Sequence, residues 1–120
     1  MAVGAKAPVV DAFNMNGEPP AGRIDAGMTA APTDTSGKYV AEVNIFEGRV
    51  DITFGNDVHA EIFGDTISFT PYMTDSGGIV WRCGGAAAPP GSVLMSGGGV
   101  QSQHVAPTVP SRYLPSTCRN

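Results

Sequence analysis

Three side chains that could bind a metal ion lie close together in the sequence. Asp57, His59 and Glu61 alternate with other residues, so an extended segment would place all three on one face. Carboxylates and imidazoles are common ligands of divalent cations. An open strand face, however, offers no closed coordination shell and no supporting residues behind the ligands. A solvated polar edge is therefore the favoured interpretation, and we expect no metal ion or other cofactor.

The other candidate reactive residues have simpler interpretations. His104 has serines nearby, but no G-x-S-x-G nucleophile elbow and no orienting acid accompany it. The run Gly97–Gly99 lacks the Lys-Ser/Thr that completes a phosphate-binding loop, so we interpret it as a flexible tether. Trp81 could stack on a sugar, although its phase in a strand favours a core position. Tyr72 and Tyr113 are more open candidates for surface contact. We expect no catalytic residue and no enzymatic activity.

The two cysteines allow three interpretations: a disulfide, part of a metal site, or two free thiols. A structural zinc site needs four ligands and usually contains a close pair of cysteines. Cys83 and Cys118 lie far apart, and the chain has only two histidines. Small secreted domains commonly join such cysteines. A Cys83–Cys118 disulfide is the favoured interpretation, and it implies the periplasm or the cell exterior.

Composition limits the remaining functions. The chain has 120 residues, 42% of them hydrophobic, with 16 Gly, 10 Pro and a net charge of −4, which is typical of one loop-rich globular domain. No two basic residues are adjacent, so we expect no direct nucleic-acid site. The sequence shows no apolar window long enough to span a membrane and no signal peptide. Together with the expected disulfide, this suggests that an N-terminal part of the protein is missing from the sequence.

The elements that must position these residues begin with a helix. Residues 2–14 have the apolar periodicity of a helix. Its apolar face is expected to contain Val3, Ala7 and Val10, with Val9 and Phe13 beside them. Pro8 either kinks this helix or marks its first turn, and Asn14–Gly17 followed by Pro19-Pro20 ends it. Residues 17–37 have no sustained period and predict a long connecting loop that wraps against the surface.

From Lys38 onward the period changes to two, which indicates strands. Two alternating runs joined at Glu47-Gly48 predict a hairpin. Thr66–Tyr72 and Ile79–Cys83 predict a third and a fourth strand. The result is a four-stranded antiparallel meander with the helix on its apolar face and water on the other. The expected core is Val43, Ile45, Ile52, Phe54, Ile67, Phe69, Ile79 and Trp81, with Val10 or Phe13 from the helix.

The segment from Gly84 to Ser111 contains no Asp, Glu, Lys or Arg and has one apolar cluster, Val93–Met95. Such a segment cannot build its own core. We therefore expect it to be the most exposed and mobile part of the chain, with mobility greatest at Gly97–Gly99. A bond from Cys83 to Cys118 would tie both ends and would stabilise the domain by about 4 kcal/mol in the loop-entropy model.

Six segments, in this order, resemble type IV pilins. The helix end reads GAKAPVVDAFNMNGEPP, and the first strand opens as SGKYV (Ser36–Val40). A hairpin NIFEGRVDITFG (Asn44–Gly55) and a strand GDTISFTP (Gly64–Pro71) follow. The sheet closes with GGIVWRC (Gly77–Cys83), and the C-terminal YLPSTCR (Tyr113–Arg119) is the most specific piece. Gly84–Gly99 departs from the family pattern as an insertion.

The resemblance implies an α+β pilin fold, in which an N-terminal helix packs on a four-stranded antiparallel meander and a C-terminal loop is closed by the Cys83–Cys118 disulfide. It implies one head domain, residues 1–120. The parts are then the end of a long helix (1–15), an αβ loop (16–38), the sheet (39–83) and a disulfide-bounded loop (84–118).

The resemblance also implies a structural subunit of a type IV pilus filament that supports adhesion, twitching motility and DNA uptake. Such a subunit lies outside the cell in the pilus and, before assembly, is anchored in the inner membrane with its head in the periplasm. Its partners are other copies of the same pilin, the pilus assembly machinery, and host surfaces or phage. It contacts the membrane only through a hydrophobic N-terminal helix that this sequence lacks. The alternatives are a type II secretion pseudopilin, which tends to lack the C-terminal disulfide, and a secreted glycan- or protein-binding module.

Overall fold

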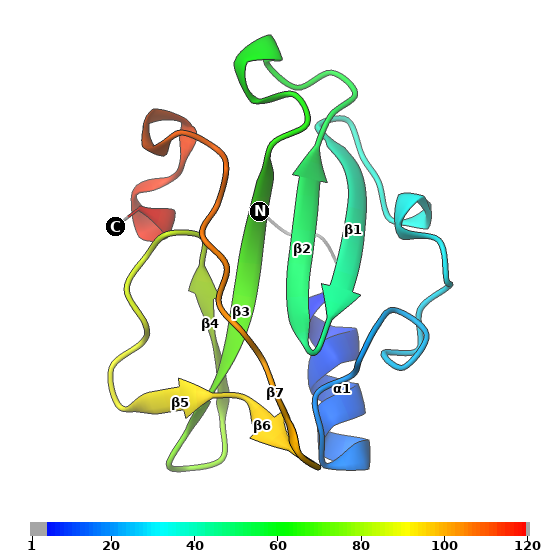
Figure 1. Ribbon diagram of the computed structural model, residues 1–120, viewed down its shortest axis with the longest axis vertical. Helices are drawn as coiled ribbons and strands as arrows, with labels where there is room; N and C mark the ends of the chain where they lie inside the picture. Colours follow the sequence, from blue (N-terminus) through cyan, green and yellow to red (C-terminus); the bar gives the residue numbers. More distant parts are fainter. Residues whose placement is uncertain (1–4, 120) are drawn as a thin grey trace.

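The computed structural model describes residues 5–119, which form one helix, an antiparallel sheet and a long C-terminal segment (Figure 1). The helix lies against one face of the sheet. The chain after the fourth strand passes over the opposite face and ends in two short 3₁₀ turns. This is the α+β pilin-like fold expected from the sequence. The expectations for residues 2–4, Val3 included, lie outside the described range.

The helix, α1 (Lys6–Asn16), is shorter than its apolar pattern suggested. Pro8 is its third residue, so its missing N–H falls in the first turn, where no helical carbonyl precedes it. Gly17 ends the helix in the left-handed conformation (φ 76°), with its N–H donating to the Phe13 carbonyl at 2.8 Å.

The buried face of α1 differs from the expected one. Ala5, just before the helix, together with Val9 and Ala12, faces the sheet at a spacing of four and three residues. Val10 and Phe13 are only half-buried, so the expectation that one of them reaches the core is wrong. Val9 and Ala12 each precede by one residue the pair Val10 and Phe13, so the buried face is turned by about 100° from the expected one.

The sheet is the expected meander of β1 (Val40–Phe46), β2 (Arg49–Phe54), β3 (Thr66–Thr74) and β4 (Ile79–Cys83), in the order β1-β2-β3-β4 with every pair antiparallel. Glu47 and Gly48 form the first turn with positive φ at both positions, 48° and 84°. This is the backbone geometry that lets two strands twist correctly across a two-residue turn. It pairs Ile45 with Val50 and so sets the register of the hairpin.

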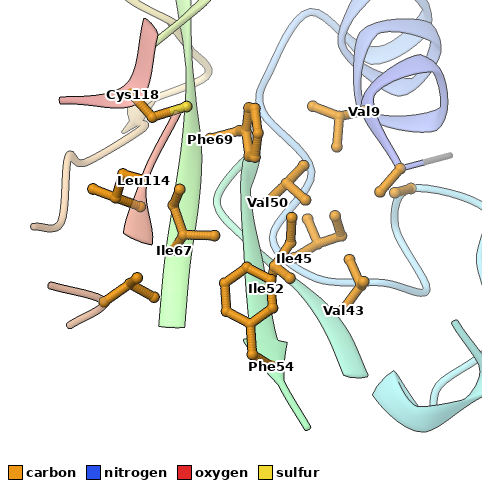
Figure 2. Packing of buried hydrophobic residues seen from close by; sticks show 13 residues of the cluster. Val9, Val43, Ile45, Val50, Ile52, Phe54, Ile67, Phe69, Leu114 and Cys118 are labelled. Carbon is orange, nitrogen blue, oxygen red and sulfur yellow. The ribbon is translucent and has the colours of Figure 1, made fainter. Parts of the chain in front are cut away.

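Six of the eight expected sheet residues form the core, which is shown in Figure 2. They are Val43, Ile45, Ile52, Phe54, Ile67 and Phe69, joined by Val50. Ile79 and Trp81 are half-buried, so their assignment to the core is wrong. Both lie on the edge strand β4, and Trp81 packs against the core cluster while staying partly exposed.

Three further strands lie in the C-terminal segment and were not expected. β5 (Ser92–Leu94) pairs with the end of β3, while β6 (Ser96–Gly97) and β7 (Val100–Gln101) form a small separate hairpin. The β2 ladder along β3 ends at Phe69 and the β5 ladder begins at Tyr72. Pro71 lies between these two ladders, which explains how a central strand tolerates a residue without an N–H.

Candidate functional site

The expected disulfide is present. Cys83 at the end of β4 is bonded to Cys118 in the last 3₁₀ turn (Ser116–Cys118), and the Cα atoms are 4.7 Å apart. This confirms the favoured interpretation of the two cysteines, and it closes a loop across 35 residues of sequence. Figure 2 places Cys118 beside Ile67 and Phe69, so the bond joins the loop to the hydrophobic core.

The last part of the disulfide-bounded loop is anchored in the core. Val109, Leu114 and Cys118 are buried in the same cluster as the sheet residues. The N–H of Gly85 donates to the Cys118 carbonyl at 3.0 Å, which ties the start of the loop to its end. Gly84 has a positive φ (53°), and a β-carbon there would press on Ile67 and on the Cys118 carbonyl. Leu114 and Cys118 therefore anchor the C-terminal end of this loop in the core, while Pro115–Thr117 between them are exposed.

Residues 102–108, here called the strap, cross the sheet face opposite α1 (Figure 1). Ser102 Oγ donates to the Glu47 carbonyl at 2.6 Å at one end, and the Thr108 N–H donates to the Thr66 carbonyl at 3.0 Å at the other. Between them, Arg49 Nη1 donates to the Gln103 carbonyl at 3.2 Å. The strap is therefore fixed at several points along its length.

The strap changes the environment of the second sheet face. Ser68, Thr70 and Tyr72 point away from α1, yet all three are buried. The expectation that this face is solvated is therefore wrong, because the C-terminal segment covers it. Tyr72 is only 5% exposed, and its hydroxyl accepts a hydrogen bond from Arg82 Nη1 at 3.1 Å. It is not the surface contact residue that the sequence suggested, whereas Tyr113 is half-buried.

The tip of the β6–β7 hairpin rests on the end of α1. A β-carbon on Gly97 would collide with the Gly17 carbonyl, and one on Gly98 would collide with Glu18. Met95, next to the hairpin, is fully buried. Gly98 and Gly99 are exposed as expected, but the backbone here approaches α1 closely because glycine has no β-carbon, and the expected mobility stays a prediction. Gly99 has open space around it.

The αβ loop (16–38) contains a buried arginine that sequence reasoning missed. Arg23 is 4% exposed and donates to the Val43 carbonyl at 2.6 Å and the Thr29 carbonyl at 2.8 Å. It also reaches the hydroxyls of Thr29 and Thr35, at 3.3 and 3.1 Å. These bonds hold the loop along the free edge of β1 and cover a backbone carbonyl there. A lone arginine in a Gly- and Ala-rich loop gives no sequence signal of this role.

The metal-binding alternative finds no support within residues 5–119, where no three His, Cys, Asp or Glu side chains gather in a way that could hold an ion. Asp57 lies in a turn, and His59 precedes the 3₁₀ turn Ala60–Ile62, so the segment is not extended. His59 Nδ1 accepts the Glu61 N–H at 3.1 Å, and its ring lies 5.6 Å from that of Tyr113.

A small pocket lies between the start of α1 and the disulfide. Its volume is about 280 Å³, and its walls are polar and apolar in nearly equal parts. They are formed by Lys6, Ile67, Phe69, Cys83, Pro115, Thr117 and Cys118. Lys6 Nζ lies 4.3 Å from the centre of the Phe69 ring and 5.7 Å from that of Trp81. Burial lowers the pKa of Lys6, because the site removes water from the ammonium group. Trp81 is thus half-buried beside a cation and is not an open platform for a sugar.

Comparison with known proteins identifies the family of this chain. A family model described as pilin, a bacterial filament protein, matches residues 1–119. The chain belongs to the pilin family. A type IV major pilin protein PilE1 of Neisseria gonorrhoeae is 29% identical to this pilin over its whole length, and the match covers 65% of that protein. A fimbrial protein of Neisseria meningitidis serogroup A is 31% identical, with 71% of its length covered.

This pilin thus spans about two thirds of the length of the relatives that it matches. Within residues 5–119, no helix is both long and apolar enough to cross a bilayer. The conspicuous features of this head hold backbone in place: a disulfide, a buried arginine and a hydrogen-bonded strap. They are the features of a structural protein.

Proposed function

We propose that this chain is the head of a type IV pilus subunit, which coats the outside of the filament. The observation that carries the proposal is the pilin match from residue 1 to residue 119, together with relatives named type IV major pilins and fimbrial protein. Both the disulfide and the strap suit a head that faces the medium, because they hold a loop-rich surface in one shape. The parts of this head are residues 1–15, 16–38, 39–83 and 84–118, all within one domain.

In this proposal the helix of the full-length subunit continues upstream of α1 as a hydrophobic segment. That segment anchors the subunit in the inner membrane with its head in the periplasm, and it packs in the core of the pilus after assembly. The direct partners are other copies of this pilin and the assembly machinery. The role of the head in this proposal is mechanical, as expected for a filament protein.

Two surfaces are suited to contact and display. Ile24 in the αβ loop is 69% exposed, and Val93 in β5 is 63% exposed. Both side chains are therefore accessible to other proteins. We assign the αβ loop to neighbouring subunits, and residues 84–94 and 99–106 to host surfaces or phage. Adhesion, twitching motility and DNA uptake would follow from the filament. The named pilin relatives disfavour a pseudopilin or a filament-free binding module.

The proposal is tested by expressing the full-length gene in a strain that lacks its own major pilin. Electron microscopy should show pili, and mass spectrometry of the sheared fraction should find this head as the main component. A matched strain would carry the same gene with a plain cleavable signal peptide in place of the N-terminal helix, and it should secrete the head without filaments. Release of monomeric head from the natural gene, with no filaments, would contradict the proposal.

A further inference from the structure

His104 is the one titratable residue of the strap, and it lies beside the covered face of the sheet. The residue is half-buried, and its Nδ1 is buried without a hydrogen-bond partner. A buried imidazole nitrogen without a partner is unusual, because most buried polar atoms form a hydrogen bond. The two strap residues before it are fixed, Ser102 to the β1–β2 turn and Gln103 to Arg49, and beyond it the Thr108 N–H is bonded to Thr66.

The charged groups around His104 come from two strands. Burial lowers the pKa of His104, and the positive charges of Arg82 on β4 and Arg49 on β2 lower it further. Arg49 pairs with Asp51, with Nε 2.7 Å from Oδ1 and Nη2 3.0 Å from Oδ2. Asp51 also accepts a hydrogen bond from Ser68 at 2.6 Å. Its charge is therefore already engaged and is poorly placed to stabilise a second cation.

Arg82 has no such partner among the described residues. Its Nε donates to the Ala86 carbonyl at 2.6 Å and its Nη1 to the Tyr72 hydroxyl at 3.1 Å, and both acceptors are neutral. From β3, the groups beneath the strap are the Tyr72 hydroxyl and Thr70, which pairs with Arg82 across the ladder and whose Oγ1 is buried without a partner. A positive charge on the strap would therefore face a net positive surface.

We propose that His104 is an acid-sensitive latch, which holds the strap on the sheet while the imidazole is neutral and releases it when the imidazole takes up a proton. In the released strap, His104 is solvated and has an ordinary pKa of about 6.5. Because the seated state binds a proton less readily than the released state, seating is favoured above this pH and is lost as the pH falls below it. The Cys83–Cys118 bond keeps the released strap attached, so the opening is local and reversible.

Hydrogen exchange read by mass spectrometry tests the latch on this chain. The opening constant of the strap amides, corrected for intrinsic exchange, is divided by that of the β2 amides. This ratio is measured at about pH 7.5 and at about pH 5.0. Linkage limits the expected rise in this ratio to about thirtyfold, because pH 5.0 lies about 1.5 units below the ordinary histidine pKa of about 6.5 and each unit corresponds to about a factor of ten. His59→Gln is the matched control, because His59 is exposed and lies outside the strap.

In wild type and in His59→Gln, the ratio should rise between about fivefold and about thirtyfold when the pH falls from about 7.5 to about 5.0, because proton uptake by His104 favours the released strap. In His104→Gln it should stay within about twofold, because glutamine is neutral at both pH values. An unchanged ratio in wild type, or an equal rise in His104→Gln, would overturn the proposal. Should His104→Gln fold poorly, NMR titration of wild type decides instead. Either of two results would contradict the proposal: a His104 pKa at or above about 6.5, or a His104 titration during which the amide chemical shifts of Ser102 and Gln103 do not change.

Discussion

Replacing both cysteines with serine, Cys83→Ser with Cys118→Ser, should lower the free energy of unfolding by about 4 kcal/mol. The bond closes a loop across 35 residues, and the entropy lost by the unfolded chain grows with the logarithm of that length. A small domain is stable by only about 5–15 kcal/mol, so the variant should remain folded but marginal. The strap keeps its bonds to Glu47 and Thr66, and Leu114 stays in the core, which is why we expect a folded protein.

Urea unfolding followed by the fluorescence of Trp81 measures this loss. The midpoint should fall, and the slope of free energy against urea should increase, because the unfolded chain without the cross-link exposes more surface. Wild type treated with reductant is the matched comparison, and it should behave as the serine variant does. A loss below about 1 kcal/mol with an unchanged slope would show that the loop-entropy reasoning does not apply to this protein.

Three further substitutions test other parts of the structure. Phe69→Ala should cost about 3–5 kcal/mol because its ring is buried, and Trp81→Ala should cost clearly less in the same urea titrations because its ring is half-exposed; equal costs would contradict the placement of β4. A Gly-Ser insertion after Gly98 should lower Tm by several degrees, about 4–8 °C per kcal/mol lost, because the tip of the β6–β7 hairpin is pressed on Glu18. The same insertion after Ser76, in the exposed β3–β4 turn, is the control and should have little effect. Arg23→Met should lower the free energy of unfolding by about 1–3 kcal/mol and make the αβ loop sensitive to protease, because the buried hydrogen bonds of Arg23 are lost. Arg112→Met, at an exposed position, is the control and should do neither. A loop that stays resistant in Arg23→Met would show that Arg23 is dispensable.

The strands were predictable because their pattern is local. Alternation of apolar and polar residues along β1, β2 and β3 fixes which side chains face the core, and the Glu47-Gly48 turn sets the register. A pairing of the two cysteines followed from their number and separation in a small domain. These features depend on nearest neighbours in the chain, or on a choice among few partners.

The helix face could not be read in the same way. The apolar residues of 2–14 allow more than one apolar face, and packing against the sheet decides which of them is buried. In the structure this face contains Ala5, Val9 and Ala12. The alternation along β4 likewise places Ile79 and Trp81 on one face, but it does not show how far each side chain is covered there.

The C-terminal segment was decided by tertiary structure alone. Residues 84–111 have no charge and no period, so the sequence indicated only a segment unable to form a core of its own. Its order comes from surfaces that other elements provide, such as the Glu47 carbonyl, the end of α1 and the buried face of β3. Glycine at 97 and 98 permits close approach, but which backbone it approaches is known only after the sheet and helix have assembled. The sequence therefore determined the sheet and the disulfide, and the packing of distant segments decided where the strap lies and that Arg23 and His104 face their present neighbours.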